Sequence, residues 1–176
     1  MVVCDHTMKI RYINAKNPGA THDSMVFNMS SLKIHLEQQH LNGLRNTWLL
    51  GDAGYALKPY LMTPFRNSEE GSLQRAYNKQ HAKGGSIIER TIGVLKNRFR
   101  CLLQAGEELH YIPKKATQII NVCAALHNIC LFYNVQIPDE EEFSNVTYDD
   151  DVGDVEVEPV DNSQAEDIRN EILRTL

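Results

Sequence analysis

Two acidic residues, Asp52 and Glu89, stand at positions where carboxylates can bind metal ions. Asp52 follows Thr47–Gly51, a short apolar run that is typical of a buried strand, and Glu89 lies in the first turn of a helix predicted from Ser86. A carboxylate at a strand end and another on a neighbouring helix can converge on divalent cations, and hard oxygen ligands suit Mg²⁺ or Mn²⁺. Two such ions about 3.5–4 Å apart can activate water and stabilise the leaving oxygen in phosphodiester cleavage.

Both acids also have a purely structural explanation. Ser86 and Glu89 have the spacing of a capping box, which stabilises a helix start by roughly 1 kcal/mol. Asp52 precedes Ala53-Gly54 and can serve as a turn residue. Spacing alone therefore leaves the metal site and the structural roles open.

A second acidic set consists of Asp5 and Asp23, the latter next to His22. Asp5 follows a predicted strand, and Asp23 follows a Pro-Gly turn. They are candidates for accessory metal-binding or DNA-positioning groups, but Asp is also common in turns and caps.

Three soft ligands share one face of a predicted helix: Cys123, His127 and Cys130 lie at i, i+4 and i+7. Such a face could bind zinc. The same face is apolar, so a buried, hydrogen-bonded histidine between two packing cysteines is the alternative, and we favour it.

Basic side chains gather between Lys79 and Lys115, where only three acids occur. Phosphate contacts from such side chains give DNA affinity that does not depend on sequence, whereas a solvated helix face is the plainer explanation. The residues that we assign to DNA binding are Lys83, Arg90, Lys96, Arg98 and Arg100.

The charge of the chain is distributed unevenly. Its 176 residues carry a net charge of −5, but residues 1–138 hold 16 Lys and Arg against 9 Asp and Glu, and residues 139–176 hold 2 against 14. A basic body can meet a polyanion. The four cysteines lack C-x-x-C spacing, which indicates reduced thiols, and apolar runs far below ~20 residues exclude an integral membrane protein.

The elements that must position these residues follow from periodicity and turn signals. We expect a β-hairpin in 2–16, a helix at Ser30–Leu41 capped by Ser30 or Ser31, and a loop over Ala53–Asn67. We expect further helices at 72–81, ending at Gly84-Gly85, at 86–103, from Pro113 to about Tyr133, and at 163–176 with Ser163 and Glu166 as a capping box. Apolar faces are predicted at Ile88, Ile92, Leu95, Phe99 and Leu102, and at Ile119, Cys123, Leu126 and Cys130.

Several stretches match, in the same order, motifs of one known family. They are VVCD (Val2–Asp5), NPGATHDSMVF (Asn17–Phe27), WLLGDAGYALKPYLMTPF (Trp48–Phe65), AYNKQHAKGGSIIERTIGVLKNRFRCL (Ala76–Leu102) and ALHNICL (Ala125–Leu131). On these motifs the chain resembles the Harbinger transposase-derived nuclease family, domesticated relatives of PIF/Harbinger transposases with a DDE superfamily endonuclease domain.

The resemblance implies an α/β fold, a ribonuclease H-like mixed sheet flanked by helices, and metal-dependent cleavage of DNA. Asp52 in LLGDAGY matches the second Asp of the family's Asp-Asp-Glu triad, and Glu89 in IIERTIG matches its Glu. The first catalytic Asp is expected on a strand upstream of VVCD, so we expect an N-terminally truncated domain that is inactive or has impaired activity. Asp5 matches a different position of the family.

The resemblance also frames the organisation and partners of the chain. We expect a partial endonuclease domain at 1–135, a disordered acidic linker at 136–162 and a short helix at 163–176. A location in the nucleus, or also in the cytoplasm, and a Myb-like protein partner beside DNA are implied, while the oligomeric state is left open. The alternative to a nuclease is a non-catalytic DNA- or protein-binding module.

Overall fold

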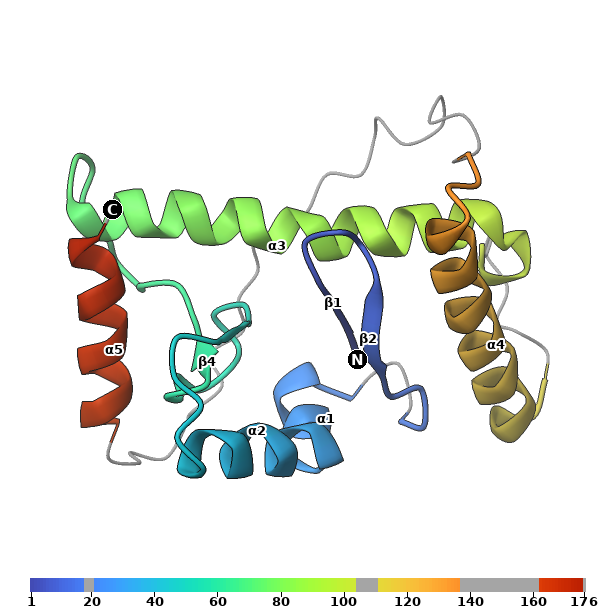
Figure 1. Ribbon diagram of the computed structural model, residues 1–176, viewed down its shortest axis with the longest axis horizontal. Coiled ribbons are helices and arrows are strands. Elements are labelled where there is room, and N and C mark those ends of the chain that lie inside the picture. The colour runs from blue at the N-terminus through green and yellow to red at the C-terminus, as the bar shows by residue number, and fades with distance from the viewer. Residues whose placement is uncertain (18–20, 104–110, 137–161, 176) are drawn as a thin grey trace. The chain divides into compact units, whose positions relative to one another are not determined.

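The computed structural model describes residues 1–17, 21–103, 111–136 and 162–175 (Figure 1). The fold is mixed α/β, with helices dominating. Within the described residues the strands form two separate two-stranded sheets and not one larger sheet. In this part of the chain, none of the helices combines the length and the apolar composition that a membrane crossing needs. Most of the predicted acidic linker lies outside the described residues.

The chain divides into two compact units. The first contains Met1–Thr21 together with the chain from Ser86 through the helix α4 (Pro113–Phe132), and the second contains His22–Gly85 together with the C-terminal helix α5 (Ser163–Arg174). Each unit has its own apolar core and is described by itself.

In the first unit a hairpin packs against α4 and against the helical segment that contains Leu95. Strands β1 (Val2–Cys4) and β2 (Ile10–Ile13) pair antiparallel, as the sequence predicts, and α4 spans Pro113–Phe132 beyond the short helix η1 (Arg100–Leu102). The buried core residues are Ile10, Leu95, Cys123 and Ala124.

The second unit surrounds a short parallel strand pair. Strands β3 (Leu49–Leu50) and β4 (Leu61–Met62) pair in parallel, with α1 (Asp23–Asn28), α2 (Ser31–Leu41) and α5 (Ser163–Arg174) as its other elements. The side chain of Ser30 accepts from the Lys33 amide at 3.2 Å, so Ser30, and not Ser31, is the cap of the two residues that the sequence offered. Its core joins Leu57, Met62 and Ala165 to Trp48, Ile168 and Ile172.

Several local predictions for the second unit are wrong. The predicted loop over 53–67 contains β4, because a two-residue strand carries no readable periodicity. The strand before Asp52 is not fully buried, since Leu50 remains 47% exposed. In α5 the cap position belongs to Asn162, so Ser163 is the first helical residue instead of the predicted cap.

The predicted break at Gly84-Gly85 is also wrong. One helix, α3, spans Leu73–Arg98 and passes through both glycines (Figure 1). A Cβ on Gly84 would lie 2.5 Å from the Leu50 Cδ1 atom, so glycine at this position leaves room for the Leu50 side chain against the helix. Glycine inside a helix costs about 1 kcal/mol relative to alanine, and the Leu50 contact accounts for Gly84 but not for Gly85. Ser86 is therefore mid-helix, and a capping box with Glu89 is excluded.

The buried faces of α3 and α4 differ from the predicted stripes. Within the first unit, α3 buries Thr91, Val94 and Leu95, whereas Ile88 and Ile92 are only half-buried. Thr91 fits this site because its hydroxyl donates to the Ile87 carbonyl at 2.7 Å. Helix α4 buries Cys123, Ala124 and His127, while Leu126, placed on the core face by spacing, is 41% exposed.

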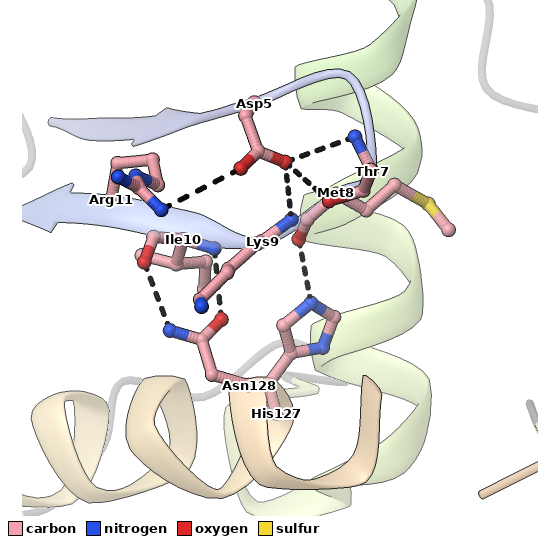
Figure 2. A network of polar contacts seen from close by, with 8 residues as sticks. All are labelled: Asp5, Thr7, Met8, Lys9, Ile10, Arg11, His127 and Asn128. Atoms are coloured by element: carbon pink, nitrogen blue, oxygen red, sulfur yellow. Dashed lines mark hydrogen bonds and ion pairs between the residues drawn. The ribbon is translucent and has the colours of Figure 1, made fainter. Parts of the chain in front are cut away.

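Two adjacent residues of α4 hold the hairpin through its backbone (Figure 2). The Asn128 side-chain oxygen accepts from the Ile10 amide, and its nitrogen donates to the Ile10 carbonyl, both at 2.9 Å. The His127 Nε2 donates to the Met8 carbonyl at 3.0 Å. Asn128 thus pairs with β2 as a neighbouring strand would, and it satisfies buried backbone groups that water cannot reach.

The same contact bears on the predicted zinc site. His127 is fully buried and its Nε2 bonds to a backbone carbonyl, as expected of a core histidine. Among the described residues, no group of three or more His, Cys, Asp or Glu side chains is arranged to hold a metal ion. The arrangement favours the hydrogen-bonded histidine over zinc.

Replacing Asn128 tests the contribution of its two hydrogen bonds with the Ile10 backbone to stability. Asn128→Ala leaves the Ile10 amide and carbonyl without partners, so we expect the free energy of unfolding to fall by about 1–3 kcal/mol. Urea titration followed by circular dichroism measures this. Asn121→Ala is the matched control, since Asn121 is exposed on the same helix and its loss should stay within about 0.5 kcal/mol. An equal loss of unfolding free energy in both variants would contradict a stabilising role of the Asn128 hydrogen bonds.

His127 predicts a pH dependence of stability. Burial lowers the pKa of His127 below its usual 6.5, the Met8 hydrogen bond opposes this shift, and the Arg98 charge adds to it. The unfolded chain therefore binds a proton below pH 6.5 that the folded protein does not. Stability should be unaffected above that pH and should fall below it by up to about 1.4 kcal/mol per pH unit.

Urea midpoints between pH 4.5 and 8 measure this dependence. His127→Gln should flatten the decline, whereas His35→Gln, which changes an exposed histidine, should leave it as in the parent chain. An unchanged slope in His127→Gln would refute the assignment.

Candidate functional site

Asp52 lies in a tight turn directly after β3. Pairing with β4 continues to Gly51, whose amide donates to the Met62 carbonyl at 3.0 Å. The Asp52 Oδ1 atom accepts from the Gly54 amide at 2.8 Å, and the Tyr55 amide donates to the Asp52 carbonyl at 3.2 Å. This is an Asx-type turn, in which the carboxylate itself fixes the backbone. Asp52 therefore stabilises the turn through its side chain and remains exposed to solvent.

The glycines of the GDAGY motif make this turn possible. A Cβ on Gly51 would lie 3.0 Å from the Tyr55 ring and 3.2 Å from Leu61, so the ring occupies the space that a side chain would need. A Cβ on Gly54 would lie 3.0 Å from the Asp52 Oδ1 atom. Larger residues at either position would displace Tyr55 or the carboxylate.

Tyr55 also links the turn to α1. Its ring meets Phe27 edge-on, with centroids 5.8 Å apart, and Phe27 is buried on α1. Asp23 is the first residue of that helix and is exposed, and its charge acts on Tyr55 together with that of Asp52. The second unit thus brings two of the sequence-predicted acids, Asp23 and Asp52, around one tyrosine.

The electrostatics of this cluster keep Tyr55 neutral. Burial is the main reason why the pKa of Tyr55 is raised far above 10, and the carboxylates of Asp23 and Asp52 raise it further. A phenolate beside two carboxylates would place a third negative charge in the same region. Asp52 accepts the Gly54 amide hydrogen bond through its Oδ1 atom, and its side chain is exposed.

Asp23 and Asp52 provide the hard oxygen donors that Mg²⁺ and Mn²⁺ prefer, so their chemistry fits such an ion. Arg66 braces the turn from outside by donating to the Ala53 carbonyl at 3.1 Å. The sequence analysis missed Tyr55 and Phe27. The GDAGY motif contained the signal, because a glycine four residues before an aromatic ring permits close stacking.

Glu89 is an exposed residue in the interior of α3. It belongs to the first unit and Asp52 to the second, so the convergence of these two carboxylates stays a prediction. With the capping box excluded, no helix-start role accounts for an acid at this position.

Asp5 organises the β1–β2 turn (Figure 2). Its Oδ1 atom accepts from the Thr7 hydroxyl at 2.6 Å, the Thr7 amide at 2.9 Å and the Lys9 amide at 3.2 Å. The Thr7 hydroxyl is the main reason why the pKa of Asp5 is lowered, and the two amides and Arg11 add to this effect. These contacts account for Asp5 without a metal ion.

The five basic residues assigned to DNA binding are not equivalent. Lys83, Arg90, Lys96 and Arg100 are exposed. Arg98 instead donates from its NH2 group to the Val135 carbonyl at 2.7 Å, and its Nε and NH1 atoms are shielded from solvent. Arg98 is thus the least suited of the five to reach a phosphate.

Comparison with known proteins identifies relatives along most of the chain. A model of the DDE superfamily endonuclease family matches residues 1–128. The protein named "Putative nuclease HARBI1" is 34% identical in Xenopus laevis over 99% of this chain and 48% of that protein, and 32% identical in Rattus norvegicus over 99% and 49%. "Protein ALP1-like" of Arabidopsis thaliana is 27% identical over 81% of this chain and 37% of its own length. No solved structure matches.

This chain spans about half the length of the HARBI1 proteins that it matches. The family model covers the hairpin, the GDAGY turn, Glu89 and the His127-Asn128 pair. The chain therefore belongs to the DDE superfamily endonuclease family and is homologous to the Harbinger transposase-derived HARBI1 and ALP1-like proteins.

Proposed function

We propose that this chain forms part of a divalent-metal-dependent DNA endonuclease domain with a ribonuclease H-like fold. The observation that carries the proposal is the position of Asp52 at the end of β3, exposed and fixed by the GDAGY turn. Membership of the DDE superfamily endonuclease family supports the same reaction class.

In this proposal Asp52 and Glu89 are the ligands of Mg²⁺ or Mn²⁺, and Asp23 is an accessory carboxylate. Bound ions of this kind supply an activated water and stabilise the leaving oxygen of a phosphodiester. The chain itself holds Asp52 still through the Gly54 amide and keeps Tyr55 uncharged beside it. A fixed carboxylate loses little conformational freedom when it binds a cation, which favours tight binding.

The exposed basic residues supply the second part of the proposal. Lys83, Arg90, Lys96 and Arg100 would contact phosphates and hold the DNA without reading its sequence. DNA binding without cleavage would instead favour the non-catalytic module. A nuclear location and a Myb-like partner belong to the proposal through the family resemblance alone.

Asp52→Asn tests the metal role. The amide keeps the size of the side chain but removes its negative charge, so Mn²⁺-induced broadening of nearby NMR signals should be lost. Mg²⁺-dependent nicking of supercoiled DNA should fall at least about 100-fold, because metal ions supply several kcal/mol of transition-state stabilisation. Nicking is measured with this chain alone and with this chain joined to the part of the Xenopus laevis relative that it does not cover.

Glu69→Gln is the matched control, because it removes an exposed acid that the proposal does not use. It should retain both Mn²⁺ broadening and nicking. Equal broadening and equal nicking in the Asp52→Asn and Glu69→Gln variants would refute the metal role of Asp52.

Removing two positive charges tests DNA binding. Lys96→Gln/Arg100→Gln should weaken binding to unrelated duplexes by a similar factor. It should also reduce the slope of log affinity against log salt by about 2, since each lost phosphate contact removes about 0.9. Fluorescence anisotropy between 50 and 200 mM salt, the range in which such slopes are usually read, measures both quantities.

Lys16→Gln/Arg75→Gln changes the net charge by the same amount at exposed positions outside the proposed surface. If this control pair reduces affinity and slope as much as Lys96→Gln/Arg100→Gln does, then only net charge matters and no surface is defined.

A further inference from the structure

Two cysteines of the first unit lie close together without being bonded. Cys101 is in η1 and Cys123 is in α4, and their Sγ atoms are 3.9 Å apart. All four cysteines are free thiols. Among the described cysteines, this is the pair whose sulfur atoms lie within hydrogen-bonding distance.

The two thiols have opposite environments. Cys123 is buried in the core of the first unit beside Leu95 and Ala124, and burial together with the neighbouring Cys101 raises the pKa of Cys123 to about 11. Cys101 is exposed. A dissolved oxidant can therefore meet Cys101 first, while Cys123 stands protected behind it as a resolving thiol.

The remaining cysteines lack this arrangement. The Cys4 sulfur accepts a hydrogen bond from the Thr91 hydroxyl at 3.3 Å, and Cys130 is half-buried about two helical turns along α4 from Cys123. Both have the character of packing cysteines. They provide internal controls for any oxidation of the pair.

We propose that Cys101 and Cys123 form a peroxide-sensitive thiol pair that closes reversibly to an intramolecular disulfide. The Cys101 thiolate attacks a peroxide oxygen, so that an S–O bond forms and the O–O bond breaks, and the departing hydroxide takes up a proton to become water. The Cys123 sulfur then attacks the Cys101 sulfenic acid. The S–S bond forms, the S–O bond breaks, and the hydroxyl group leaves as water with the Cys123 proton. Both thiols are oxidised by one equivalent of peroxide, which is reduced to water.

Closure requires a modest local movement. The sulfur atoms must approach from 3.9 Å to about 2.05 Å, the length of a disulfide bond. The bond would tie η1 to α4 and close a loop between positions 101 and 123. Because a closed loop restricts the unfolded chain, the oxidised protein should unfold at a higher temperature than the reduced protein.

Stoichiometric hydrogen peroxide on the reduced full chain tests the pair. We expect the number of titratable thiols to fall from four to two, a Cys101–Cys123 cross-linked peptide in the digest, and a higher melting temperature. Dithiothreitol should reverse all three changes. Cys101→Ser, a surface change, should abolish the cross-link and the thermal shift, whereas Cys4→Ser and Cys130→Ser should retain both.

Three outcomes would overturn the proposal. One is oxidation of Cys101 to the sulfinic acid without a cross-link, and another is a Cys101–Cys101 disulfide between two chains. The third is a cross-link that involves Cys4 or Cys130. Cys123→Ala serves as a second variant and should leave Cys101 at the sulfenic or sulfinic stage, detectable by dimedone labelling and mass.

Discussion

The close packing of the Tyr55 ring on Gly51 is the contact on which the candidate site depends. Because Gly51 has no side chain, the ring can fold back over the end of β3. The backbone between them must then turn sharply, and that turn carries Asp52 with its carboxylate bonded to the Gly54 amide. The contact between Tyr55 and Gly51 thus fixes an exposed carboxylate at the end of β3.

The same ring explains why a second acid lies nearby. Phe27 meets Tyr55 edge-on, and this contact places the start of α1, and with it Asp23, on the same side of the second unit. Neutral Tyr55 between two carboxylates is consistent with a region that attracts cations. The chain belongs to the DDE superfamily endonuclease family, and the proposed role of these two acids in metal binding rests on that membership together with this geometry.

The first unit depends on a different device. Its hairpin is held to α4 through hydrogen bonds to backbone groups: Asn128 bonds to the amide and carbonyl of Ile10, and His127 donates to the carbonyl of Met8 (Figure 2). The hairpin contributes main-chain atoms to these hydrogen bonds, whereas α4 contributes side chains. The contacts therefore constrain the residue types of α4 more than those of the hairpin. Cys123 of α4 is buried in the same core, with the exposed Cys101 3.9 Å away, so the redox state of the pair would act on the helix that holds the hairpin.

Much of this architecture followed from local patterns. The sequence by itself determined the hairpin, the start of α2 with a cap at Ser30 or Ser31, and the extent of α4, because each rests on alternation, a capping residue or a proline at the helix start. It also singled out Asp52 and the GDAGY motif. These features involve residues near one another in the chain, so nearby residue types are sufficient to predict them.

Only the tertiary structure decided the features that involve distant partners. Gly84 lies against Leu50, more than thirty residues earlier in the chain, and the Leu50 side chain occupies the space that a Cβ would need. Thr91 is buried and Leu126 is exposed against their polarity, because neighbouring elements and not helical spacing fix which face is covered. Likewise, Tyr55 contacts Phe27 and Asn128 bonds to the Ile10 backbone, and no local sequence pattern predicts either contact.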